Sequence, residues 1–172
     1  MRRFNKMRKR ILLLLGVLTL SVGISRGALA DSIILGPHDF HPQSEDTDYE
    51  KNDLQIYMMP GSAESYFSAP VHLPQGAKVT SVVVFYYDDW GSGDLIVSFK
   101  KVNAYTAAET FMADWRSSGQ VASRQVHKIS PITGGNTIDN GGYVYRVMVL
   151  FEDPSAQTLV KLHAVKILYT TT

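Results

Sequence analysis

Alternating apolar and polar positions dominate the chain from residue 54 onward. Residues 78–87 (KVTSVVVFYY) are rich in β-branched and aromatic side chains, and the odd-numbered side chains of 143–151 are all apolar or aromatic. Residues 94–102 alternate as well, with Ser98 and Lys100 on the polar face. A period of two is typical of β-strands. These three segments are therefore predicted to be strands that bury one face.

Short stretches that favour turns separate these segments. Residues 88–93 (DDWGSG) favour a loop, so 78–87 and 94–102 are predicted to pair as a hairpin. Further strands are expected at 32–35, 54–59, 65–68, 120–129 and 159–170.

Two segments have less regular patterns. The spacing of residues 106–115 (TAAETFMADW) is consistent with a helix or a strand, and the pattern leaves both open. In 159–170 the apolar side chains change parity, which predicts a β-bulge near His163 and Ala164. Seven to nine short strands with almost no helical period predict an all-β fold. We expect a single antiparallel β-sandwich, of jelly-roll type.

The first thirty residues have the pattern of a secretory signal peptide. Residues 1–10 hold six basic side chains, 11–24 are apolar, and the sequence Ala-Leu-Ala ends at Ala30. Fourteen apolar residues are fewer than the roughly 20 that span a bilayer. The sequence thus predicts cleavage after Ala30, no stable membrane anchor, and a secreted protein that is extracellular or periplasmic.

The predicted mature chain is acidic. Residues 31–53 carry seven of the acidic side chains and are predicted to form a polar N-terminal arm, followed by the sandwich domain at 54–172. Without residues 1–30 the chain has ten basic and sixteen acidic residues, a formal charge of −6. That charge argues against nucleic acid and anionic lipid as partners. The chain has no cysteine, so disulfides and thiol chemistry are excluded.

Several segments resemble one family pattern. They are 66–80 (YFSAPVHLPQGAKVT), Tyr86-Tyr87-Asp88, 138–145 (IDNGGYVY) and 162–170 (LHAVKILYT). Together they are similar to secreted, uncharacterised bacterial proteins with a C-terminal β-sandwich, which share an APVxLPxGAxVT entry and a V(R/K)IxYT closing strand. The resemblance covers most of 54–170 and implies the fold and secretion. It assigns no catalytic residue.

An oxygen-rich loop is the strongest candidate for a metal site. Asp88, Asp89 and Asp94 gather carboxylates near two glycines, and calcium prefers such oxygen ligands. The alternative is a solvated turn in which Asp and Gly serve only the backbone. Calcium is therefore the one cofactor that the sequence suggests.

Aromatic residues beside carboxylates suggest a second chemistry. Trp90 and Trp115, together with Asp88 and Asp89, fit a carbohydrate site in which flat rings stack on sugars. The alternative is that these rings pack on the core or on a neighbouring chain.

The sequence holds no motif of an enzyme. No serine lies in a Gly-x-Ser-x-Gly elbow, and no pair of carboxylates is brought together, so no catalytic residue is assigned. The main hypothesis is a secreted, non-catalytic structural, adhesive or assembly module. In that case the arm 31–53 or the edge segment 69–77 pairs with itself or with another protein. The alternative is a carbohydrate-binding module with polysaccharide as partner, and a hydrolase is the minor alternative.

Overall fold

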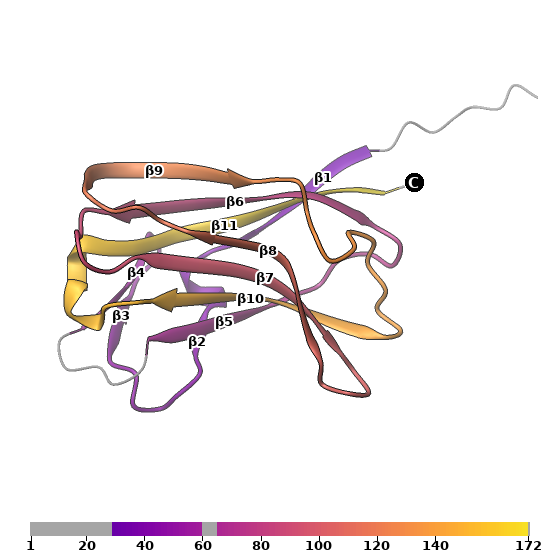
Figure 1. Ribbon diagram of the computed structural model, residues 1–172, viewed down its shortest axis with the longest axis horizontal. Helices are drawn as coiled ribbons and strands as arrows, with labels where there is room; N and C mark the ends of the chain where they lie inside the picture. The colour runs from indigo at the N-terminus through magenta and orange to yellow at the C-terminus, as the bar shows by residue number, and fades with distance from the viewer. Residues whose placement is uncertain (1–28, 60–64, 172) are drawn as a thin grey trace, which may run out of the picture.

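Two antiparallel β-sheets pack face to face in the computed structural model, which describes residues 29–59 and 65–171 (Figure 1). The predicted all-β sandwich is confirmed. Residues 1–28, which hold nearly all of the predicted signal peptide, lie outside the described residues. None of the helices in the described ranges has the length and hydrophobicity needed to cross a membrane.

The first sheet has six strands. Their order is β3–β4–β11–β6–β9, and β1 also pairs with β11. The bounds are β1 (Leu29–Leu35), β3 (Tyr49–Lys51), β4 (Ile56–Met58), β6 (Lys78–Asp88), β9 (Val121–Ile129) and β11 (Val160–Thr171). Two short 3-10 helices, η1 (Pro37–Asp39) and η2 (Pro154–Leu159), lie outside the sheets.

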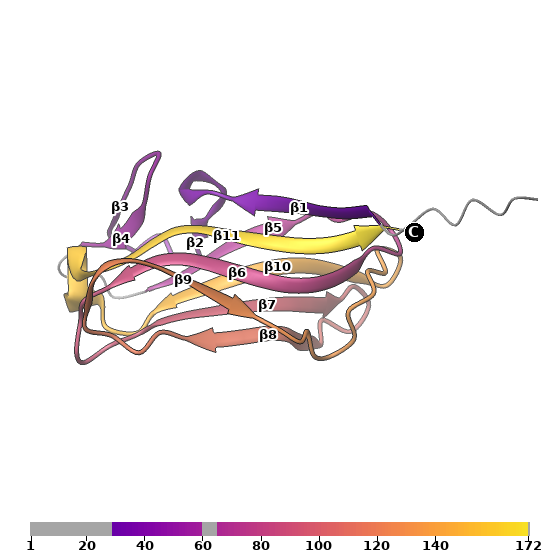
Figure 2. The same cartoon turned by 90° about the horizontal axis from the view of Figure 1, so that it is seen from above.

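The second sheet has five strands in the order β2–β5–β10–β7–β8. The bounds are β2 (His41–Pro42), β5 (Tyr66–Val71), β7 (Leu95–Asn103), β8 (Glu109–Arg116) and β10 (Tyr143–Phe151). The segment 106–115, whose pattern fitted a helix or a strand, is therefore strand over most of its length. Figure 2, seen from above, shows the strands of the two sheets overlapping, because one sheet lies over the other.

The core lies between the sheets and follows the period of two. Val147 and Val149 of β10 and Val165 and Ile167 of β11 are all fully buried. Burying a side chain of this size stabilises the fold by about 1.5–3 kcal/mol relative to leaving it exposed. The side chains between them in sequence face outward, so each sheet has one outer face available for function.

The predicted bulge in the last strand is confirmed. Leu162 and Ala164 of β11 pair with Tyr86 and Phe85, which are consecutive residues of β6, so His163 has no partner on that strand. This extra residue explains the change of parity along the sequence. It allows both Leu162 and Val165 to face the core.

Two sequence predictions are wrong. Strands β6 and β7 do not form a hairpin, because β6 lies in the six-stranded sheet and β7 in the five-stranded sheet. Residues 89–94 instead cross from one sheet to the other. The prediction failed because alternation shows which face of a strand is buried but not which strand it pairs with. Residues 31–53 do not form an arm, because β1 pairs with β11 over all seven of its residues. The strand predicted at 32–35 lies within β1 and is confirmed, whereas the acidic composition of 31–53 obscured Phe40, which is buried in the core.

Candidate functional site

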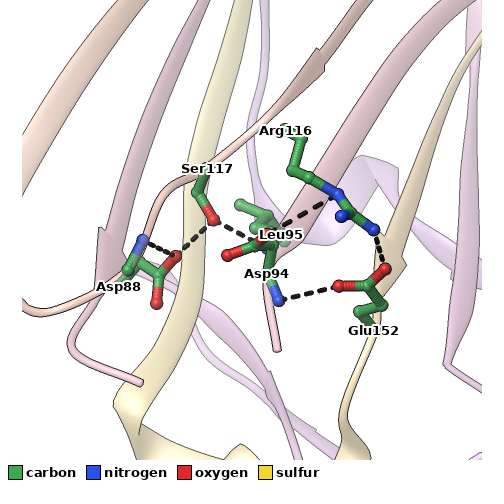
Figure 3. Close-up of polar contacts among 7 residues, drawn as sticks. Asp88, Asp94, Leu95, Arg116, Ser117 and Glu152 are labelled. Carbon is green, nitrogen blue, oxygen red and sulfur yellow. Dashed lines mark hydrogen bonds and ion pairs between the residues drawn. The ribbon is translucent and has the colours of Figure 1, made fainter. Parts of the chain in front are cut away.

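Asp88, a predicted ligand for both calcium and sugar, lies inside the protein. Its side chain is fully buried, and its carboxylate accepts hydrogen bonds from the Ser117 hydroxyl, the Gly119 N–H (3.2 Å) and the Trp90 N–H (3.2 Å). Figure 3 shows the contact with Ser117, whose hydroxyl oxygen also accepts a bond from the Leu95 N–H at 2.8 Å. Asp88 therefore ties the loop after β6 to the loop between β8 and β9.

Asp89 and Asp94 do not share contacts with Asp88 or with each other. Asp94 forms an ion pair with Arg116 at 3.5 Å, and Arg116 also pairs with Glu152 (Figure 3). The backbone N–H of Asp89 donates to the Leu159 carbonyl at 2.9 Å. In the described ranges, no three or more histidine, aspartate or glutamate side chains are grouped so that they could hold a metal ion. The fold therefore does not gather the predicted calcium ligands into one group.

Both tryptophans make packing contacts. The Trp90 indole N–H donates to Asp153 at 3.0 Å, and hydrogen bonds from Ser155 and Trp90 lower the pKa of the Asp153 carboxyl. The Trp115 ring stacks on His127 with centroids 4.8 Å apart and meets the Tyr86 ring at 4.7 Å. Both tryptophans are half-buried against the core. Their rings therefore fit the alternative that the sequence left open, in which they pack on the core instead of forming an open platform for sugars.

A groove lies elsewhere, on the outer face of the five-stranded sheet. It has a volume of about 290 Å³, which is near the lower end of the roughly 300–1,000 Å³ range of ligand sites. The strands that line it are β5, β10, β7 and β8. We call it the outer groove and define it by Tyr66, Ile96, Ser98, Lys100, Phe111, Asp114, Met148 and Leu150.

Strand register brings these residues together from distant parts of the chain. Met148 pairs with Ser98, and Ser98 pairs with Asp114, so that the three form one row across the sheet. Lys100 and Phe111 are partners in a neighbouring row. The flanking Val97 and Phe99 are fully buried in the core, which places Ser98 and Lys100 on the outer face.

Two aromatic side chains mark opposite sides of the groove. Tyr66 on β5 is 39% exposed, and Phe111 on β8 is 49% exposed. Three strand spacings separate β5 from β8, which is about 14 Å across the sheet. The ammonium group of Lys100 lies 4.4 Å from the centroid of the Phe111 ring. This cation–π contact helps to orient the ring.

Much of the groove lining is apolar, and its polar side chains, Ser98, Lys100 and Asp114, are internally paired. The Ser98 hydroxyl donates to Asp114 at 2.6 Å, and the Lys100 ammonium forms an ion pair with Glu109 at 3.1 Å. Arg146 also pairs with Glu109. Burial and the nearby Arg146 guanidinium lower the pKa of Lys100. The floor therefore presents fixed donors and acceptors with balanced charge.

Sequence patterns could identify only a small part of this site. The alternation of 94–102 placed Ser98 and Lys100 on the polar face, and both lie on the outer face of the sheet, where they line the groove although they are largely buried. Tyr66, Phe111 and Asp114 were not identified, because only strand register shows that they lie near Ser98. The exposure of Phe111 was also hidden by its place in a segment with no clear period.

Comparisons with known proteins show the fold alone. No family model matches the chain, and no curated protein matches its sequence. The mosquito-larvicidal Cry4Aa toxin from Bacillus thuringiensis has a similar region, with a TM-score of 0.54 and 8% identity over 82% of this chain. This chain spans only 24% of the toxin and 35% of a family two carbohydrate esterase from Cellvibrio japonicus.

Smaller solved proteins are similar over nearly their whole length. A family 35 carbohydrate binding module from Clostridium thermocellum has a TM-score of 0.43 and 11% identity, covering 80% of this chain and 97% of the module. A family 29 module from Piromyces equi has a TM-score of 0.45 and 12% identity, covering 83% and 91%.

Proposed function

We propose that this chain is a non-catalytic carbohydrate-binding module whose ligand site is the outer groove. The observation that carries the proposal is the combination of two exposed aromatic rings, Tyr66 and Phe111, with a few fixed polar side chains between them. Flat rings provide apolar surfaces for the faces of pyranose sugars, and a few placed polar groups fix the ligand's orientation.

The floor has hydrogen-bonding capacity left for sugar hydroxyls. Asp114 accepts the Ser98 hydroxyl through Oδ1, and its Oδ2 has no hydrogen bond to any described residue. The Lys100 ammonium has three donor hydrogens, and Glu109 accepts one of them. A hydroxyl that donates to Asp114 and accepts from Lys100 would satisfy both groups. Bonds to charged partners of this kind are stronger than neutral ones.

The balance of charge favours a neutral glycan. Two cations, Lys100 and Arg146, are matched by Glu109 and Asp114 at the floor of the groove or beside it. An anionic sugar would have to compete with these carboxylates for the same cations. The predicted export of the chain would bring it to polysaccharides outside the cytoplasm.

The proposal is tested by retention of the purified chain on a panel of neutral and acidic polysaccharides. We expect at least one neutral polysaccharide to retain the protein, and the double variant Tyr66→Ala/Phe111→Ala to lose retention. Val126→Ala is the matched control, because Val126 is exposed on the other sheet. The proposal is overturned if no glycan is retained, or if the double variant binds as tightly as the original chain.

A further inference from the structure

Four cations occupy the outer face of the six-stranded sheet. Two rows of register partners carry them: Lys166–Val83–Lys128 and Lys161–Tyr87–Arg124, each running across β11, β6 and β9. Their neighbours Val82, Val84, Val165 and Ile167 are fully buried, which places these rows on the outer face. We call Arg124, Lys128, Lys161 and Lys166 the basic frame.

The frame surrounds an apolar centre. Its two sides lie two strand spacings apart, about 10 Å, and the two rows lie about 13 Å apart along β6. The row between them consists of Ala164, Phe85 and Val126, and Val126 is 60% exposed. A hollow of about 300 Å³ opens beside this row, and the exposed Ile34 and Leu54 are among its lining residues.

No cation of the frame is in an ion pair with a carboxylate of residues 29–59 or 65–171. Lys161 instead lies over the rings of Tyr87 (5.1 Å) and Tyr57 (6.0 Å), and Arg124 contacts the His163 ring at 3.3 Å. The carboxylate that lines the hollow, Asp53, is paired with His38 at 2.9 Å. Among the described residues, the frame is therefore a positively charged surface whose cations form no direct ion pair with a carboxylate.

The same chain presents a complementary surface elsewhere. Residues 44–48 lead from β2 into β3, and their three carboxylates are exposed: Glu45, Asp46 and Asp48. Glu45 and Asp46 have no ion pair with any residue that the structure describes. Figure 1 shows the connection between β2 and β3 at the bottom of the molecule, on the side remote from β9. This acidic segment is therefore remote from β9. It excludes Glu50, which lies on β3 of the six-stranded sheet and accepts a hydrogen bond from Tyr57, over whose ring Lys161 lies.

We propose that the acidic segment of one copy docks on the basic frame of a second copy. Because the two surfaces differ, the contact is heterologous, and repeating it gives open chains or rings. Opposite charges would steer the two copies together, and the apolar centre of the frame would lose its contact with water. The outer groove lies on the sheet opposite the basic frame.

Size-exclusion chromatography with light scattering tests this inference on the purified chain. At about 0.02 M salt we expect masses above that of a single chain that rise with protein concentration, and at about 0.5 M salt we expect the monomer, because salt screens exposed charges. Lys128→Gln/Lys166→Gln and Glu45→Gln/Asp46→Gln should each weaken association at least tenfold. Circular dichroism and a thermal melt check that both variants are folded.

Mixing the two double variants gives the decisive result. One variant keeps an intact acidic segment and the other keeps an intact basic frame, so the mixture should form a one-to-one dimer that cannot grow further. The proposal is overturned if the original chain is monomeric at low salt, if its association persists in high salt or in either variant, or if the mixture stays monomeric.

Discussion

Among the residues that the structure describes, the charged side chains are paired in the outer groove on one face of the sandwich and unpaired in the basic frame on the other. On the five-stranded sheet, Lys100 and Arg146 both pair with Glu109, and Asp114 holds Ser98. On the six-stranded sheet, the four cations of the basic frame have no ion pair with a carboxylate in the part of the chain that the structure describes. The paired charges fix the floor of a groove, whereas the unpaired charges remain available to a partner.

The aromatic residues also differ between the two outer faces. Tyr66 and Phe111 stand at opposite sides of the outer groove with rings exposed to solvent. Phe85 and Tyr87 lie between cations on a surface whose exposed apolar groups are mostly aliphatic. Two faces of one fold can therefore suit two ligands: a small polar molecule between rings on one side, and a charged protein surface on the other.

Loss of Asp88 should have the largest effect, because it damages the sandwich that supports both faces. Asp88→Ala removes a buried acceptor from the Ser117 hydroxyl and from the N–H groups of Gly119 and Trp90. Leaving such groups unsatisfied should lower the free energy of unfolding by at least about 3 kcal/mol. Urea denaturation measures this change, and Asp88→Asn, which keeps one acceptor oxygen, should lose less. A loss below about 1 kcal/mol would show that the buried carboxylate is not a structural tie.

Truncation of one aromatic side chain should weaken only the glycan binding at the five-stranded sheet. Phe111→Ala should weaken glycan binding about tenfold, because stacking of an aromatic ring is worth roughly 1 kcal/mol or more. The ring is half exposed, so the melting temperature should change little. Titration calorimetry measures the affinity, and Phe111→Tyr should retain it. Equal affinities for the Ala variant and the original chain would remove Phe111 from the site.

A change of charge at the groove floor should have a more moderate effect. Asp114→Asn keeps the size of the side chain but removes its negative charge, so hydrogen bonds from sugar hydroxyls should weaken and affinity should fall about fivefold. The same substitution should leave self-association unchanged, because Asp114 lies on the sheet opposite the basic frame. If Asp114→Asn lost self-association but kept its glycan affinity, the assignment of the two faces would be contradicted.

The smallest predicted effect concerns His163 on the six-stranded face. Burial, with Arg124 and Lys161 nearby, lowers the pKa of His163 below its usual 6.5. Between the folded-state pKa and 6.5 the unfolded chain binds a proton that the folded chain does not, so stability falls as the pH drops through that window. His163→Gln should make the unfolding free energy less dependent on pH there. An unchanged pH profile in urea denaturation would contradict this.

Much of the fold could be predicted from the sequence because burial follows the period of two. The strands at 78–87, 120–129 and 143–151 and the bulge at His163 all appear as changes in that period. Strand partners could not be predicted, since alternation is the same in a hairpin and in a crossing between sheets. For that reason β6 and β7 were assigned to one hairpin although they lie in different sheets.

The candidate site could be predicted only in part, for a related reason. Trp90, Trp115 and Asp88 have the side-chain types of a sugar site, yet the structure places them in packing and loop contacts. The outer groove instead depends on the register that brings Asp114 beside Ser98, which are sixteen residues apart. Composition indicates the chemistry that is present, but only strand pairing shows which side chains share a surface.

Amide chemical-shift mapping by NMR, with a polysaccharide fragment that the chain retains, tests the central claim most directly. The account predicts that the largest shift changes occur at Tyr66, Ser98, Phe111 and Asp114, with little change around Val126 on the opposite sheet. Shift changes centred on Trp90 and Trp115 would place the ligand at the loops between the sheets. That result would contradict the assignment of the outer groove as the binding site.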